Sequence, residues 1–140
     1  MSNFLSLRHL GIVTSKINES VTFYEDLGFR VYWDKEETGS FINDILNQDI
    51  EFLRTVKMKN QYFCIELLDF EKQSEINNVK ITDQCLTHFA VDVKNIKEIY
   101  RKYENFFLNE PQENEDGKFL VAFMKDPNNE LYIELVEKIK

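Results

Sequence analysis

The sequence predicts an α+β fold of two tandem modules, each in the order strand-helix-strand-strand-strand, and two matches within the chain are the reason. Under a shift of 79 residues, His9 falls on His88 and Tyr24 falls on Tyr103. Under a shift of 68 residues, residues 65–68 fall on residues 133–136, so the second copy is 11 residues shorter (79 − 68). One such module leaves a face of its sheet uncovered, and two copies are expected to pair in order to bury it.

The first module is expected over about residues 5–70, and it opens with a strand and a helix. Residues 8–14 are a short apolar run with β-branched side chains, which predicts the strand. Asn18 is the expected N-cap of the helix, and Gly28 is expected to end it. Apolar residues recur between these two at helical spacing: Ile17, Val21, Tyr24 and Leu27.

Three further strands are expected in the first module, at residues 29–33, 50–58 and 61–70, with a turn at Lys59-Asn60. The polar stretch 36–47 predicts a loop with a short helical turn. Within it, residues 36–42 could cover a ligand site as a lid, or could equally form a loop that caps the edge of the sheet.

The second module is expected over about residues 84–138, after a linker at residues 72–82. A strand is predicted at residues 85–93, and a helix follows on the spacing of Ile96, Ile99, Tyr100 and Tyr103. A short strand at 106–108, an acidic loop at 110–117, and strands at 119–124 and 131–136 complete it. Residues 126–129 between the last two strands have the composition of a turn.

Composition limits the classes of function. The chain has 140 residues, which fits a single domain over 1–140, and 17 basic against 25 acidic residues give a net charge of −8. An acidic chain argues against a nucleic-acid partner and against anionic membrane surfaces. We expect no membrane helix and no signal peptide, because neither apolar pattern is present. Two cysteines without CxxC spacing indicate reduced thiols in a cytoplasmic protein.

Four polar residues interrupt apolar strands at equivalent places in the two copies. Side chains two residues apart share a strand face, so apolar neighbours can pack against the helices while the polar residues point to the concave side. Both histidines of the chain are among them, and so is one carboxylate from the last strand of each module: His9, Glu66, His88 and Glu134. Two neutral imidazoles and two carboxylates suit a divalent transition metal and give a neutral site.

Motifs that resemble a known family span nearly the whole chain. They are His9-Leu10-Gly11-Ile12-Val13, Phe23-Tyr24, Leu27-Gly28-Phe29, Ile65-Glu66-Leu67-Leu68, Thr87-His88-Phe89-Ala90-Val91, Asp126-Pro127-Asn128 and Ile133-Glu134-Leu135. With these motifs the sequence resembles the vicinal oxygen chelate superfamily, and within it the glyoxalase I-like proteins. The resemblance implies paired βαβββ modules that form a half-barrel around a metal site, with the four polar residues above in the ligand positions of glyoxalase I.

The resemblance also implies an activity. A glyoxalase I-type enzyme is a metal-dependent lyase or isomerase, and it moves a proton through a metal-bound enediolate of an α-hydroxy-carbonyl substrate. By similarity, Glu134 is the first candidate for the base, and Glu66 is the second candidate or the returning acid. Zinc, nickel, cobalt, manganese and iron all suit these ligands. The thiol and the substrate stay open.

Two alternative functions remain open within the same family. One is an acyl-CoA epimerase similar to methylmalonyl-CoA epimerase, which uses the same metal and enolate chemistry. The other is a small-molecule or antibiotic binding protein, or a thiol-transfer resistance protein. An extradiol dioxygenase is disfavoured, because the chain has no third histidine for acid–base work.

Five further residues are candidates for the lining of a substrate pocket: Phe52, Arg54, Phe119, Phe123 and Tyr132. Among them Arg54 could meet an acidic or phosphorylated substrate. We expect a homodimer, because open sheets leave edges and apolar surface that a partner covers. The site can then form within one chain or across two swapped chains.

Overall fold

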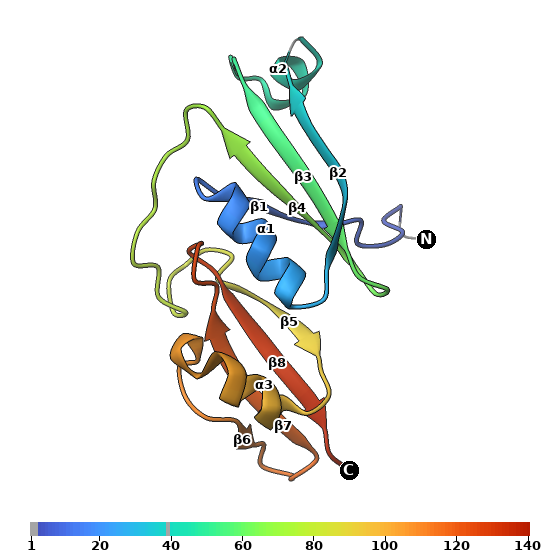
Figure 1. Ribbon diagram of the computed structural model, residues 1–140, viewed down its shortest axis with the longest axis vertical. Helices are drawn as coiled ribbons and strands as arrows, with labels where there is room; N and C mark the ends of the chain where they lie inside the picture. Colours follow the sequence, from blue (N-terminus) through green and yellow to red (C-terminus); the bar gives the residue numbers. More distant parts are fainter. Residues whose placement is uncertain (1–2, 39) are drawn as a thin grey trace. The chain divides into compact units, whose positions relative to one another are not determined.

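The computed structural model describes residues 3–38 and 40–140, and it confirms the α+β fold. The chain divides after Glu75 into two compact units, which we call the first and second modules. Each module has one mixed four-stranded sheet with a helix across one of its faces (Figure 1). The two tandem βαβββ-like modules that the repeat predicts are therefore present.

The sheet of the first module has the order β1-β4-β3-β2. Strand β1 is parallel to β4, and the other neighbours are antiparallel. The elements are β1 (Leu10–Val13), α1 (Ile17–Asp26), β2 (Arg30–Glu37), α2 (Ser40–Leu46), β3 (Leu53–Lys59) and β4 (Cys64–Phe70). Helix α1 lies along one face of this sheet (Figure 1).

Helix α1 begins two residues earlier than expected. Lys16, not Asn18, is the N-cap, and its side chain makes no capping hydrogen bond. The hydroxyl of Thr14 instead accepts the backbone N–H of Lys16 at 3.0 Å. The predicted end of the helix is confirmed: Gly28 has a φ of 96°, and the N–H groups of Gly28 and Phe29 reach back to the carbonyls of Glu25 and Tyr24. These two bonds form a Schellman motif.

The core of the first module lies between α1 and the sheet. Val56, Met58, Ile65 and Leu67 alternate along β3 and β4, and all four are fully buried. Tyr24 of α1 is also fully buried, with its ring edge-on to Phe23 and Phe29 at 5.2 and 5.8 Å. Aromatic pairs in this arrangement add to the burial of apolar area, so α1 is fixed over one chosen face of the sheet.

The second module repeats this plan in the order β5-β8-β7-β6. Its elements are β5 (His88–Asp92), α3 (Ile96–Tyr103), a 3₁₀ turn (Glu104–Phe106), β6 (Gln112–Glu113), β7 (Phe119–Lys125) and β8 (Tyr132–Lys138). The carboxylate of Glu137 on β8 accepts the N–H groups of Asn95 and Ile96, both at 2.9 Å. This carboxylate therefore satisfies the first free donors of α3 and joins the helix to the sheet.

Two sequence-based expectations are wrong in their details. The short strand expected at 106–108 is the end of the 3₁₀ turn plus a single bridge between Phe107 and Met124, while β6 lies inside the expected acidic loop. The expected loop 36–47 contains the end of β2 and the whole of α2. The lid expected at 36–42 includes Gly39, which lies outside the described residues.

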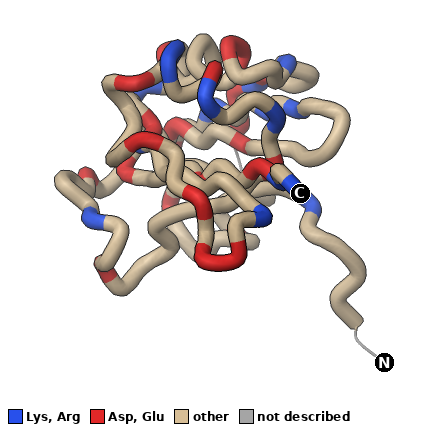
Figure 2. The backbone as a smooth tube through the Cα atoms, turned by 90° about the horizontal axis from the view of Figure 1, so that it is seen from below, with Lys and Arg blue, Asp and Glu red and all other residues tan. Residues whose placement is uncertain are grey.

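None of the helices in residues 3–38 and 40–140 has the length and apolar character that crossing a membrane requires. Lys and Arg positions are interspersed with Asp and Glu positions along the backbone (Figure 2).

The left-handed conformation at Gly28 predicts a contrast between two glycine substitutions. Gly28→Ala is expected to lower the free energy of unfolding by about 1–2 kcal/mol, because a Cβ is strained at positive φ. Gly11→Ala is the matched control: its added Cβ meets only Leu68 Cδ1, at 3.9 Å, which is ordinary contact. Urea unfolding of both variants measures the difference, and equal losses would contradict the assignment.

Candidate functional site

The two faces of each sheet differ sharply in composition. On the side of α1 lie Ile65 and Leu67, and on the side of α3 lie Ile133 and Leu135, all four buried. The intervening residues of β4 and β8 point to the opposite face, which carries no helix (Figure 1). We call this the open face of each module, and the four sequence-predicted polar residues lie on it.

In the first module, His9 and Glu66 form a close pair on the open face. Gly11 of β1 stands beside Glu66 in the parallel register, and His9 lies two residues before Gly11 on the same face. The Nε2 atom of His9 is 3.7 Å from Oε1 of Glu66. Their side chains are 34% and 15% exposed, so the pair is accessible to a small ligand.

In the second module, His88 and Glu134 repeat this arrangement. Ala90 of β5 stands beside Glu134, and His88 lies two residues before it. The Nε2 atom of His88 is 3.4 Å from Oε2 of Glu134. A residue with little or no side chain thus stands next to each glutamate, and this leaves room for the imidazole to reach it.

Each pair fits one divalent metal ion as two ligands. Bonds from Zn²⁺ to nitrogen or oxygen are about 2.1 Å long, so one ion can bridge donor atoms up to about 4.2 Å apart. Both His–Glu separations are within that span, at 3.7 and 3.4 Å. Across the described ranges, no group of three or more His, Cys, Asp or Glu side chains gathers closely enough to hold an ion. The spacing within each pair is therefore compatible with two ligands of one ion.

The residue on the other side of each glutamate differs between the modules. In the antiparallel register, Lys57 of β3 faces Glu66, and Phe123 of β7 faces Glu134. The Nζ atom of Lys57 is 3.6 Å from Oε2 of Glu66, so that carboxylate stands between an imidazole and an ammonium. In the second module, the ring of Phe123 instead lies edge-on to His88, with the centroids 5.3 Å apart.

Three of the five sequence-predicted pocket residues lie on the open face of the second module with Glu134. Phe119 and Phe123 share that face on β7, and Tyr132 precedes Glu134 by two residues on β8. The side chain of Tyr132 is buried, and its hydroxyl donates to the backbone carbonyl of Val79 at 2.9 Å. Phe123 therefore borders the pair directly, whereas the hydroxyl of Tyr132 is already engaged.

Arg54 lies on the α1 side of its sheet, so the structure does not bring it beside the pair. Its guanidinium donates two hydrogen bonds to the carboxylate of Asp34, at 3.0 and 2.9 Å, and a third to Oδ1 of Asn18 on α1. The bond from Arg54 holds the pKa of Asp34 below its usual value, and the same bond raises the pKa of Arg54. Arg54 thus links β2, β3 and α1.

Phe52 also lies away from the pair. It lines a cavity of about 260 Å³ at the end of β3 and β4, together with residues 48–51 and 70–74. That cavity contains neither His9 nor Glu66.

Sequence reasoning missed the aromatic and basic side chains beside the first pair. The register between β2 and β3 skips Tyr32, which is the extra residue of a β-bulge, and it places Trp33 opposite Lys57 on the open face. Partial burial raises the pKa of Tyr32, and the neighbouring Cys64 and Glu66 add to that effect. The available signal was the single tryptophan of the chain in a run with Lys35 two residues away.

The comparisons with known proteins agree with this architecture. Residues 6–134 match the family model described as the Glyoxalase/Bleomycin resistance protein/Dioxygenase superfamily. No curated protein matches the sequence significantly.

Solved structures of similar fold cover nearly the whole chain. A glyoxalase family protein from Bacillus cereus has a TM-score of 0.86 at 14% identity, covering 99% of this chain and 97% of that one. Lactoylglutathione lyase from Agrobacterium tumefaciens has a TM-score of 0.62 at 13% identity, covering 97% and 96%. The trypanothione-dependent glyoxalase I of Leishmania major has a TM-score of 0.60 at 22% identity, covering 96% and 87%. At these identities the likeness shows the fold.

The ion pair of Arg54 predicts a pH-dependent loss of stability. Arg54→Gln is expected to lower the free energy of unfolding at pH 7 by about 0.5–1 kcal/mol, a modest value because both side chains are partly exposed. Since the folded-state pKa of Asp34 is depressed, its contribution is present above the usual Asp value of about 3.9 and is lost as the pH falls through the folded-state pKa. Urea unfolding at pH 7 and about pH 3 measures the gap in unfolding free energy between the unchanged chain and Arg54→Gln. This gap should be smaller at about pH 3, and Arg101→Gln is the charge-matched control. A gap that stays constant would contradict the assignment.

Proposed function

The chain belongs to the glyoxalase/bleomycin resistance protein/dioxygenase superfamily, and from that premise we propose that it is a metal-dependent lyase or isomerase of the glyoxalase I type. The observation that carries the proposal is the repetition of one His–Glu pair, with nearly the same separation, at equivalent positions of both modules. Superfamily membership favours a small molecule as the substrate. A protein that only sequesters small molecules has no need of either pair.

In this proposal His9, Glu66, His88 and Glu134 are the ligands of a divalent ion. The ion, when bound, supplies a Lewis acid that stabilises negative charge on an oxygen next to the carbon that loses its proton. The imidazoles must be neutral to act as ligands, so metal affinity falls as the pH is lowered.

Glu134 is proposed as the base that moves the proton. One of its oxygens faces His88, and within the described part of the chain the other has no charged partner, because Phe123 stands across the ladder. Both oxygens of Glu66 already face a basic group, His9 on one side and Lys57 on the other. Glu134 therefore has one oxygen that no charged group of the described residues faces and that a substrate can approach, whereas both oxygens of Glu66 are engaged.

The proposed ligand set predicts the metal content of variants. The purified chain is expected to bind one divalent ion per chain, because the two pairs share it. Both His9→Ala and His88→Ala should then lose nearly all of it, measured by elemental analysis after dialysis against Zn²⁺. The matched control is Tyr62→Ala, an exposed aromatic residue at the β3–β4 turn. Two ions per chain, with each variant losing one, would contradict a shared site.

Mixing the two histidine variants distinguishes a site within one chain from a site across two swapped chains of a homodimer. If each site draws on two chains, a mixed dimer of His9→Ala and His88→Ala contains one intact site, so mixing restores part of the bound metal. If each site lies within one chain, mixing restores none. A control with His88→Ala alone at the same total concentration shows the baseline.

The proposed base predicts a loss of activity that is larger than the loss of metal. Glu134→Gln is expected to lower kcat by about 10²–10⁴-fold, the usual contribution of a positioned general base. Activity is measured with methylglyoxal plus a series of thiols, and with methylmalonyl-CoA for the epimerase alternative. Glu98→Gln, an exposed carboxylate on α3, is the control. Metal-loaded protein that turns over none of these substrates, or a fully active Glu134→Gln, would count against the assignment.

A further inference from the structure

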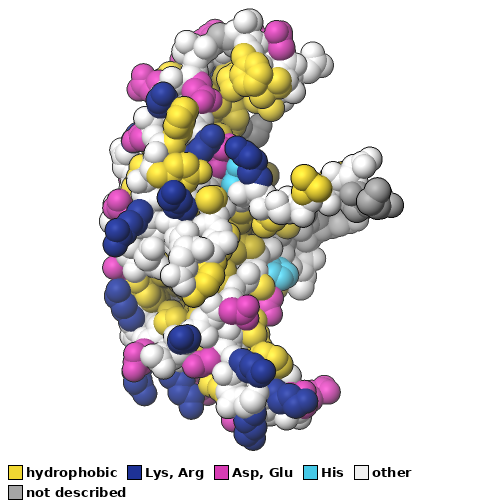
Figure 3. Space-filling view, turned by 90° about the vertical axis from the view of Figure 1, so that its right-hand side faces the viewer, with side chains coloured by type: hydrophobic (Ala, Val, Ile, Leu, Met, Phe, Trp, Pro, Cys, Tyr) yellow, Lys and Arg dark blue, Asp and Glu magenta, His cyan; other side chains and the backbone are white. Residues whose placement is uncertain are grey.

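Basic and aromatic side chains gather on the open face of β2 and β3 in the first module. Figure 3 shows Lys and Arg side chains next to one of the two histidines. We propose that Trp33, Lys35 and Lys57 form a binding site for the carboxylate of an aromatic organic acid. We call these three residues the Trp33 cluster.

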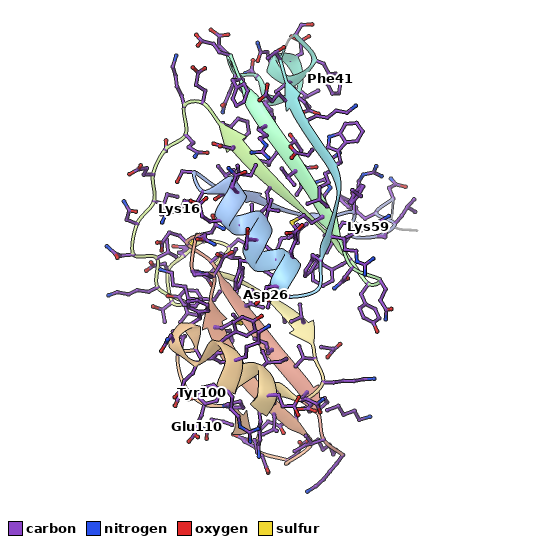
Figure 4. All side chains as sticks on the ribbon, viewed as in Figure 1. Lys16, Asp26, Phe41, Lys59, Tyr100 and Glu110 are labelled. Carbon is purple, nitrogen blue, oxygen red and sulfur yellow. The ribbon has the colours of Figure 1, made fainter. Side chains whose placement is uncertain are left out.

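The geometry of the cluster is set by one indole. The Nζ atom of Lys35 lies over the ring of Trp33, 4.1 Å from its centroid, and the Nζ atom of Lys57 lies over it at 5.2 Å. Next to them lies Lys59, at the end of β3 (Figure 4). Its Nζ atom lies over the ring of Tyr32, 4.9 Å from the centroid. Two ammonium groups on one ring repel each other, and an anion between them would relieve that repulsion.

The bulge in β2 brings the two aromatic rings to the same face. In regular pairing Tyr32 and Trp33 would point to opposite faces of the sheet. The register skips Tyr32, so Trp33 faces Lys57 while Tyr32 interacts with Cys64, which is on the open face as well. Tyr32 is 47% exposed, which leaves ring surface for an aromatic ligand to stack on.

The charge balance of this face departs from that of the chain. The protein carries a net charge of −8, yet Lys35 and Lys59 have no carboxylate within 4 Å among the residues described. By contrast, Arg54 on the other face of the same sheet is fully paired with Asp34. The open face also carries the carboxylates of Glu37, which accepts from Thr55, and of Glu66, which is paired with Lys57. Of the described residues on this face, Lys35 and Lys59 are therefore the positive charges that are left to meet an anion.

The indole N–H of Trp33, a hydrogen-bond donor without an acceptor in the described part of the chain, also favours an anion at this site. The Nε1 atom of Trp33 is buried and, within residues 3–38 and 40–140, has no hydrogen-bond acceptor. Leaving such a buried donor without a hydrogen bond costs about 1–3 kcal/mol. A carboxylate oxygen held by the lysines can supply the missing acceptor after a small shift of their flexible side chains.

Lys57 connects the cluster to the candidate metal pair, because it lies between Trp33 and Glu66. The equivalent position in the second module is Phe123, so the anion site belongs to the first module only. This inference rests on the proposed function in one respect: it takes the carboxylate to be part of the substrate whose carbonyl reacts at the pairs. It names that substrate as an aromatic organic acid.

The single tryptophan makes the site directly observable, since all tryptophan emission comes from Trp33. The full chain, stripped of metal with a chelator, is titrated with benzoate, and with benzamide as the uncharged probe of the same shape. Benzoate should change the emission saturably and bind roughly five times more tightly than benzamide, with the preference fading as salt rises.

Variants then assign the preference to the cluster. Lys35→Gln should weaken benzoate binding by about fivefold and Lys35→Arg should restore it, whereas Lys94→Gln, the charge-matched control in the second module, should stay within about twofold. Equal binding of benzoate and benzamide, or equal effects of Lys35→Gln and Lys94→Gln, would overturn the inference and leave the metal proposal standing. If instead the metal proposal failed while benzoate was still preferred over benzamide, the anion site would stand and its link to the metal pairs would be overturned.

Discussion

Each sheet of this protein has one helix to cover it, and that one-sided cover decides where the polar side chains of the strands can stand. Along β4 and β8, alternate apolar residues are buried on the sides of α1 and α3: Ile65, Leu67, Ile133 and Leu135. The intervening residues cannot be buried by the same helix, because strand side chains alternate. Glu66 and Glu134 occupy two of these intervening places. His9, just before β1, and His88, at the start of β5, lie beside them on the neighbouring strands. Glu66, for example, is held on a hydrogen-bonded strand between the fully buried residues Ile65 and Leu67. Such a rigid support is what a catalytic or binding side chain needs in order to keep its position.

The same plan is used twice, but the two copies have diverged beside the glutamate. Across the ladder Glu66 meets Lys57, and Glu134 meets Phe123. The first copy thus adds charge and the second adds apolar surface. In the proposed function, an ammonium near Glu66 would help to hold a charged group, and the ring of Phe123 would exclude water from Glu134, the proposed base.

The repeat made most of the fold predictable, because equivalent histidines and glutamates mark equivalent strands. The exact ends of individual helices and strands were harder to predict from the sequence. Asn18 has the right chemistry for an N-cap, but its side chain accepts a hydrogen bond from Arg54, a residue 36 positions away. Residues 112–113 look like loop, and they form β6 because they pair with Leu120 and Val121. The face of Arg54 depends on the register of β3, and the position of Trp33 depends on the bulge at Tyr32. Neither the register nor the bulge can be inferred from residue spacing within one strand, so the Trp33 cluster could not be predicted. The His–Glu pairs could be predicted, because they recur at equivalent positions of the two copies.

The central claim is that both histidines bind the same metal ion. X-ray absorption spectroscopy of the Zn²⁺-loaded chain measures this directly, because rigid imidazole rings give a distinct multiple-scattering signal. We expect a shell of nitrogen and oxygen only, at about 2.0–2.1 Å, with two imidazoles per ion. A shell with one imidazole per ion would mean that each module binds separately. Sulfur at about 2.3 Å, from Cys64 or Cys85, or a shell without imidazole, would contradict the account altogether.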